Sequence, residues 1–212
     1  MRFYKMEPKY GDEVGKTFPQ SQDVISDLHY DSPNHLRNVW GKFPDDVYIP
    51  DSILNSKARF TDLISSSPIS YPILSEKLKK IIEANGKTGL EFHSTYVIQK
   101  QIKVKYWIMN GYEYDYRYIN FEESLINVVG IGRVVLDQLH LKTKEGFEMA
   151  KESIKSPQSI WISKLVLKSG IKEALIIIDK SPGGKFYFSE KLKNIIENAG
   201  CTGIKFKSLN DS

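Results

Sequence analysis

The segment whose residue types come closest to a phosphate-binding loop is residues 11–17, GDEVGKT. A P-loop needs four residues between its glycines, whereas three separate Gly11 from Gly15. It also needs a strand before it and a helix after it, so that backbone amides converge on the phosphates. Pro19 follows too closely for such a helix to begin. Residues 130–132, GIG, lack the third glycine of a dinucleotide-binding turn. We therefore expect no nucleotide site at either place.

The other reactive side chains do not form a recognisable constellation. The single cysteine, Cys201, excludes an internal disulfide and a cysteine-based zinc site. Neighbouring carboxylates such as Asp45–Asp46 and Glu122–Glu123 are typical of solvated loops. The four histidines lie far apart in the sequence, at His29, His35, His93 and His140. We expect no catalytic residues, no metal and no cofactor; an enzyme of unknown type stays open as an alternative.

The composition indicates a globular protein with a real core. The chain has 212 residues, 41% of them hydrophobic, and a formal net charge of +4. Its longest apolar run, residues 174–178, is far shorter than the ~20 residues that cross a bilayer. The opening residues do not contain an apolar stretch followed by small residues. We therefore expect a cytoplasmic protein without a membrane partner.

An internal repeat organises the chain. Residues 75–92 read SEKLKKIIEANGKTGLEF, and residues 189–206 read SEKLKNIIENAGCTGIKF, with the same residue at twelve of the eighteen positions. Each copy predicts a helix that begins after a capping serine, Ser75 or Ser189, and has an apolar face at i, i+3 and i+4. Gly86 and Gly200 are expected at the end of each helix with a positive φ. A strand should follow in each copy.

Strands are also expected upstream of each copy, so that each half is a strand–strand–helix–strand unit. We predict an α+β fold with mixed or antiparallel sheets, a few short helices and a central β-hairpin. The prediction is one domain over residues 1–212, with related segments at about 46–98 and 160–209. Residues 99–159, containing the hairpin and a helix, would join them. Because one short helix leaves much of a sheet uncovered, the two halves should share one core.

The central hairpin is predicted from residues 101–119, QIKVKYWIMNGYEYDYRYI, where two runs of period two flank Asn110–Gly111. A two-residue loop at Asn110–Gly111 and a three-residue loop at residues 109–111 compete. The three-residue loop keeps the apolar side chains and tyrosines on one face, and we favour it. It predicts four core-facing tyrosines (Tyr112, Tyr114, Tyr116 and Tyr118). Trp107, Glu113, Asp115 and Arg117 would then share the opposite face.

The repeat unit resembles a hallmark of bacterial immunity proteins, namely the eleventh and forty-third immunity families of polymorphic toxin systems. The similar segments are residues 71–92 and 186–209, the strand 161–167 and the opening residues 3–6. The resemblance implies a small cytoplasmic protein without catalytic residues, which binds a cognate toxin protein and neutralises it in the producing cell. It matches residues 93–160 least, and partner specificity would reside there.

A toxin-binding protein needs a surface patch with a few aromatic or arginine anchors. The expected patch is the exposed hairpin face with the hairpin tip, comprising Trp107, Met109, Tyr112, Glu113, Asp115 and Arg117. The alternative is that another element simply covers this face. The positive net charge argues against a protein that plugs a basic nuclease site. A second alternative is a nucleic-acid-binding module that uses Lys103, Lys105 and neighbouring tyrosines.

Overall fold

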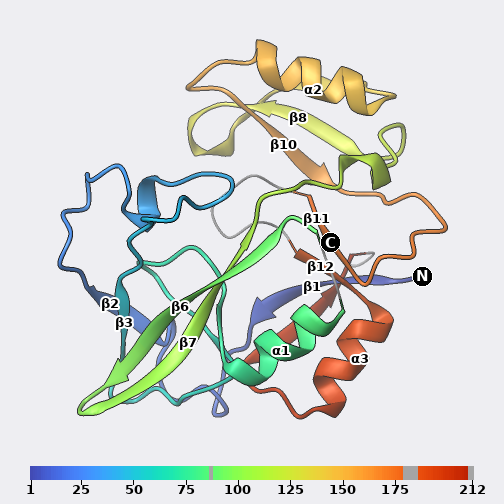
Figure 1. Cartoon of the computed structure of the whole chain (residues 1–212). Coiled ribbons are helices and arrows are strands. Elements are labelled where there is room, and N and C mark those ends of the chain that lie inside the picture. The colour runs from blue at the N-terminus through green and yellow to red at the C-terminus, as the bar shows by residue number, and fades with distance from the viewer. Residues whose placement is uncertain (86–87, 179–185, 210–212) are drawn as a thin grey trace. The chain divides into compact units, whose positions relative to one another are not determined.

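The computed structural model describes residues 1–85, 88–178 and 186–209. Within them the chain forms three α-helices, three short 3-10 helices and thirteen strands, in mixed and antiparallel sheets. The predicted α+β class is therefore confirmed (Figure 1). Contacts divide the chain into two compact units, and each is described by itself. The predicted single domain with related segments at 46–98 and 160–209 stays a prediction.

The larger unit, Arg2–Tyr114 with Glu173–Ser208, contains both copies of the repeat and two sheets. The six-stranded sheet has the order β2-β3-β6-β7-β5-β4, and the four-stranded sheet has the order β11-β12-β1-β13. Their strands are β1 (Phe3–Pro8), β2 (Ser21–Ile25), β3 (Asp51–Leu54), β4 (Leu63–Ile64), β5 (Ile73–Leu74), β6 (Leu90–Gln99), β7 (Ile102–Gly111), β11 (Leu175–Ile177), β12 (Phe186–Ser189) and β13 (Ile204–Ser208).

The two repeat helices begin as predicted. Helix α1 (Glu76–Ala84) is capped by Ser75, and helix α3 (Glu190–Asn198) by Ser189; each serine hydroxyl accepts a hydrogen bond from the amide three residues later. Gly200 has a φ of 64°, as expected after a helix, while Gly86 lies outside the described residues. The apolar faces of both helices contribute to one buried cluster, which includes Leu78, Ile82, Leu192 and Ile196. The predicted shared core is therefore confirmed.

Each repeat helix packs on a strand that sequence reasoning did not assign to its repeat. In the first copy, β7 lies between β5 and β6, and Trp107 pairs with Leu74 on one side and Ser94 on the other. In the second copy, β1 lies between β12 and β13, and Tyr4 pairs with Phe188 and Ser208. Since Leu74 and Ser94 precede Phe188 and Ser208 by the repeat distance, Tyr4 occupies the place of Trp107. The N-terminal strand thus completes the second copy (Figure 1).

The predicted position of the central hairpin is wrong. Strands β6 and β7 pair over ten residues each, from Leu90 opposite Gly111 to Gln99 opposite Ile102, so the turn lies at Lys100–Gln101. Lys100 adopts a φ of 55° to close this turn. Residues 116–118 form a 3-10 helix rather than part of a returning strand, so the four tyrosines do not line one strand face.

Asn110 and Gly111 are the last two residues of β7, where they serve packing instead of a turn. The buried Asn110 amide donates hydrogen bonds to the Gly41 carbonyl oxygen and to Glu91 Oε1, both at 2.7 Å. A Cβ atom on Gly111 would lie 2.7 Å from Ile177 Cδ1, so glycine leaves room here for the Ile177 side chain. Long-range pairing and close packing therefore override the local turn signal.

The smaller unit consists mainly of Asp115–Lys172. Its three-stranded sheet has the order β10-β8-β9, formed by β8 (Leu125–Val129), β9 (Val135–Leu139) and β10 (Ser159–Lys164). Helix α2 (Lys144–Ser153) lies within residues 99–159, where a helix was expected, and buries Phe147 against Tyr116 and Phe121. No helix in the described ranges is both long and apolar enough to span a membrane.

Substituting Gly111→Ala tests the role assigned to this glycine. We expect the free energy of unfolding to fall by about 1–3 kcal/mol, because the new methyl group overpacks against Ile177. Gly146→Ala in α2 is the control, since its Cβ would lie 3.5 Å from the nearest atom and alanine favours a helix. Urea unfolding measures both. A Gly111→Ala protein as stable as the wild type would contradict the packing role.

Candidate partner-binding surface

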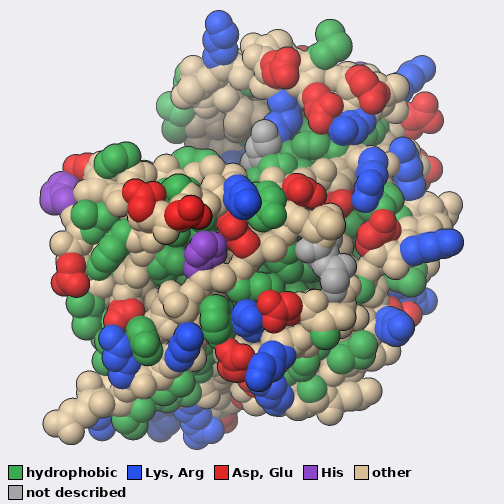
Figure 2. All heavy atoms as spheres, in the orientation of Figure 1, with side chains coloured by type: hydrophobic (Ala, Val, Ile, Leu, Met, Phe, Trp, Pro, Cys, Tyr) green, Lys and Arg blue, Asp and Glu red, His purple; other side chains and the backbone are tan. Residues whose placement is uncertain are grey.

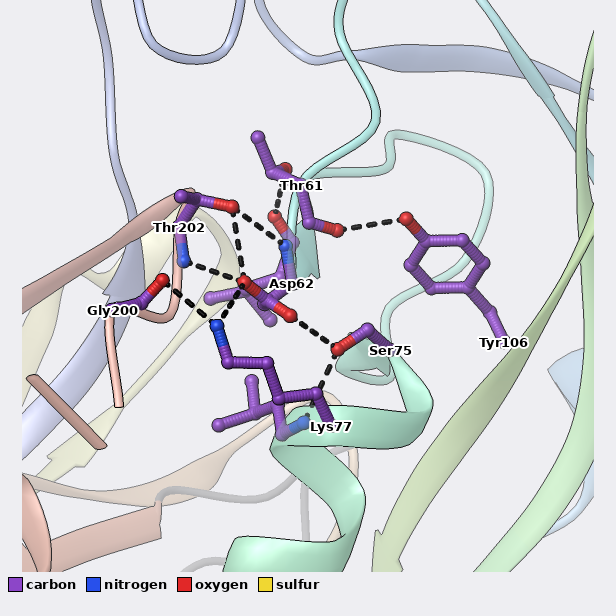
Figure 3. Close-up of polar contacts among 9 residues, drawn as sticks. Thr61, Asp62, Ser75, Lys77, Tyr106, Gly200 and Thr202 are labelled. Atoms are coloured by element: carbon purple, nitrogen blue, oxygen red, sulfur yellow. Dashed lines mark hydrogen bonds and ion pairs between the residues drawn. The ribbon is translucent and has the colours of Figure 1, made fainter. Parts of the chain in front are cut away.

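A polar cluster around Asp62 joins the two copies of the repeat (Figure 3). The Asp62 carboxylate accepts hydrogen bonds from Ser75 Oγ at 2.6 Å and from the Thr202 amide at 2.7 Å. Lys77 Nζ lies 3.8 Å from the same carboxylate and donates to the Gly200 carbonyl oxygen at 2.9 Å. Asp62 thus binds the cap of α1 to the turn that follows α3. Its contacts are those of a structural junction.

Cys201 lies in this turn and has the properties of a packed thiol. Burial raises its pKa, and the negative charge of Asp62 acts in the same direction. A thiol with a raised pKa is a weak nucleophile because little thiolate is present near neutral pH. Among the described residues, no group of three His, Cys, Asp or Glu side chains could hold a metal ion.

A pocket of about 470 Å³ lies between β1 and the segment 63–72. Its charged residues, Lys5 and Glu7, form an ion pair with each other at 2.7 Å. Tyr71, which also lines it, donates its hydroxyl hydrogen bond to the Val39 carbonyl oxygen, and burial raises its pKa to about 12. These groups are therefore engaged in the structure itself rather than poised as an acid or a base.

The structure separates the residues predicted to form one patch. Met109 is fully buried in the core shared by α1 and α3, and Asp115 is 5% exposed, so the expectation that both are displayed is wrong. The reason is the shifted turn, which places Met109 inside β7 opposite Phe92. Asp115 and Arg117 belong to the smaller unit, where Arg117 Nη2 lies 3.8 Å from Asp115 Oδ1.

Tyr112 and Glu113 follow the end of β7 in the larger unit. The Tyr112 amide donates a hydrogen bond to the Gly89 carbonyl oxygen at 2.8 Å, and Lys42 Nζ lies 5.8 Å from the tyrosine ring centroid. Glu113 is exposed, and its side chain occupies the space that a Cβ on Gly89 would fill. Whether either residue binds a partner stays a prediction.

Trp107 is half-buried on the face of the β6–β7 hairpin that packs against helix α1. The ammonium groups of Lys79 and Lys105 lie 4.5 and 4.6 Å from its ring centroid. Its indole N–H donates a hydrogen bond to Glu76, which lowers the pKa of that carboxyl group. In the second copy, Tyr4 repeats this arrangement with Lys193 at 5.1 Å and Glu190. These contacts of Trp107 therefore belong to the shared scaffold.

The hairpin continues beyond the shared scaffold and carries further cationic and aromatic side chains. Tyr96 pairs with Lys105 across the two strands, and Lys103 Nζ lies 4.1 Å from the Tyr96 ring centroid. A hydrogen bond to Asp51 at 2.9 Å raises the pKa of Lys103. We call the set Tyr96, Lys103, Lys105 and Trp107 the aromatic–lysine row. Figure 2 shows Lys and Arg side chains interspersed with hydrophobic ones where this hairpin lies in Figure 1.

The sequence analysis named three members of this row but assigned them to different functions. Trp107 was predicted to bind a protein partner, and Lys103 and Lys105 to bind nucleic acid. It missed Tyr96, because residues 90–99 were not recognised as the partner of β7. The difference between the copies lies in strand length: β6 has ten residues and pairs with β7 at every position, whereas the corresponding strand of the second copy, β13, has five.

No protein-family model matches this chain, and no curated protein matches it significantly.

The Asp62 junction can be tested by substitution. We expect Asp62→Ala to lower the free energy of unfolding by about 2–4 kcal/mol, because Ser75 and the Thr202 amide lose a charged acceptor. Asp45→Ala is the control, since Asp45 is exposed in a loop. Thermal and urea unfolding measure the difference. Equal stability of the two variants would show that the junction contributes nothing.

Proposed function

We propose that the protein is an immunity protein, which binds a toxin made by the same cell and neutralises it in the cytoplasm. The segments that resemble immunity families, 71–92 and 186–209, supply the two copies of the scaffold. The observation that carries the proposal is the aromatic–lysine row. Trp107 lies in the part that both copies share, and Tyr96, Lys103 and Lys105 lie where the first copy extends past that part. β13 ends at Ser208 and β1 begins at Phe3, whereas β6 and β7 continue to Gln99 and Ile102.

The chemistry of the row suits a protein surface. Trp and Tyr are the residue types that most often dominate binding energy, because they bury large rigid areas at a small entropy cost. Tyr96 is 39% exposed, so its ring can be reached by a partner. Lys105, at the edge of these anchors, steers a partner with an acidic face. We therefore expect the toxin to present a carboxylate-rich surface with an apolar centre.

The same row also offers what a single-stranded nucleic acid would use, namely aromatic rings with cations beside them. The protein partner is favoured because Lys103 is already paired with Asp51, and Lys79 with Glu83 at 2.8 Å. Few lysines then remain to replace the counterions of a phosphate backbone. Oligonucleotide binding that falls steeply with salt and is lost in Lys105→Glu would favour the nucleic-acid function instead.

The decisive measurement is complex formation with the product of the neighbouring gene. Co-expression should restore growth, and the purified proteins should form a 1:1 complex by light scattering. Trp107→Ala should weaken binding by about 30-fold or more, the loss typical of an interface hot spot. Lys105→Glu should weaken it by about tenfold, mainly through slower association. Failure of the neighbouring product to bind would overturn the proposed function.

The duplication provides a matched control for the tryptophan. Tyr4→Ala removes an aromatic ring with the same helix, lysine and glutamate contacts, yet it lies on β1 rather than on the hairpin. It should cost similar stability and leave toxin affinity within about twofold. If Tyr4→Ala and Trp107→Ala weaken binding equally, the loss reflects the scaffold, and the row is not the binding surface.

A further inference from the structure

Asp51, the first residue of β3, contacts two members of the aromatic–lysine row. Strand β3 pairs in parallel with β6, the strand that carries Tyr96. Asp51 Oδ1 accepts a hydrogen bond from the Tyr96 amide at 3.2 Å, and Asp51 Oδ2 accepts one from Lys103 Nζ at 2.9 Å. Because Lys103 Nζ also lies 4.1 Å from the Tyr96 ring centroid, one carboxylate holds both the aromatic residue and its cation.

The stability of the scaffold does not explain this pair. Beside Trp107, Lys79 pairs with Glu83 on the next turn of the same helix, and pairs of this spacing stabilise a helix. Lys103 and Asp51 are 52 residues apart and belong to different strands. Exposed ion pairs of this kind contribute little to stability. The larger effect of Asp51 is therefore on the charge of the row.

Asp51 changes the charge that the row presents to a partner. The side chains of Lys103 and Asp51 are 50% and 23% exposed, so a partner meets a neutral pair at this point. Lys105 is exposed and, within the described ranges, forms no ion pair, so it supplies the positive charge. The row thus offers two aromatic rings with one available cation and with a carboxylate beside them.

This arrangement distinguishes between two kinds of partner. A single-stranded nucleic acid that stacks its bases on the rings carries a phosphate at every nucleotide, so a phosphate would lie near the Asp51 carboxylate. A protein can instead place an uncharged group or a hydrogen-bond donor against Asp51 and a carboxylate against Lys105. Like charges that meet in an interface are a general means of excluding the wrong partner.

We propose that Asp51 is a specificity-determining residue, which prevents the aromatic–lysine row from binding single-stranded nucleic acid and leaves the row to a protein partner. The inference rests on the proposed function for the protein partner only, since the exclusion of nucleic acid can be measured on this chain alone. It predicts a gain of binding. Removing the negative charge of Asp51 frees Lys103 and leaves two available cations, Lys103 and Lys105, in the row.

Asp51→Asn tests the proposal, because its amide oxygen can still accept the Tyr96 hydrogen bond while the charge is lost. The probe is a fluorescently labelled oligodeoxythymidine, titrated at several salt concentrations. The wild-type chain should bind it weakly, and the variant at least about tenfold more tightly at low salt. The slope of log K against log salt should become steeper by about 0.7, as expected for one further phosphate contact on a single strand.

Two further variants separate the effect of Asp51 from that of net charge. Asp45→Asn removes an exposed charge in a loop outside the row and should change oligonucleotide affinity by less than about twofold. Adding Lys103→Gln to Asp51→Asn should cancel the gain, because the freed ammonium group is then absent. In the wild-type chain, NMR titration should show the pKa of Lys103 above its ordinary value, since the hydrogen bond to Asp51 raises it, and Asp51→Asn should lower that pKa.

Four outcomes would overturn this role of Asp51. They are an oligonucleotide affinity that is equal in the wild type and in Asp51→Asn, a gain that Asp45→Asn reproduces, a gain that survives Lys103→Gln, and an ordinary pKa of Lys103 in the wild-type chain. With the toxin, Asp51→Asn should reduce the ratio of toxin affinity to oligonucleotide affinity by at least about tenfold, and an unchanged ratio would show that Asp51 does not set specificity. A neighbouring gene product that does not bind the wild-type chain would overturn the proposed function alone, because the oligonucleotide and NMR measurements do not involve it.

Discussion

Each repeat helix rests on three strands, of which the middle one comes from elsewhere in the chain. A short amphipathic helix gains most of its stability from packing, so α1 and α3 are stable only where such a platform exists. In the first copy the hairpin partner of the exit strand, β7, provides the middle strand. In the second copy β1 provides it, from the opposite end of the sequence. The pairing of β1 with β12 and β13 therefore connects two segments that are far apart along the chain, and the shared core depends on it.

The duplication also separates structural from functional features. Contacts that occur in both copies, such as the capping serines and the lysine over an aromatic ring, are explained by the needs of the scaffold. Features present in one copy need a different explanation. Asp62 is one such feature, and it occupies the place of Ala174 in the second copy. The backbone carbonyl oxygen of each accepts a hydrogen bond from the amide of the capping serine. The carboxylate then reaches Thr202 and links the copies. The extension of β6 and β7 past the shared part is the other.

Much of the fold could be predicted from the sequence because its signals are local. The two helices follow from a capping serine and an apolar period of 3.6 residues, and these signals do not depend on distant residues. The hairpin was misplaced because Asn110–Gly111 is a strong turn signal that long-range packing overrides at this position. The role of β1 could not be predicted, since its pairing partners are more than 180 residues away and its pattern is that of any strand. The candidate surface was found in part: Trp107 was named, whereas Met109 and Asp115 are buried, and Tyr96 depends on the pairing of β6 with β7.

A duplicated scaffold suits the proposed binding function, because the residues that stabilise the fold are separate from the surface residues that can vary. The two copies share one core, so each stabilises the helix and strands of the other. The exposed side chains beyond the shared part, Tyr96, Lys103 and Lys105, lie outside that core and can vary at a small cost in stability. A partner-binding surface must match its partner in shape and charge, and it must change when the partner changes. The place where variation costs least is therefore also the place where specificity is most easily adjusted, which is where Tyr96, Lys103 and Lys105 lie.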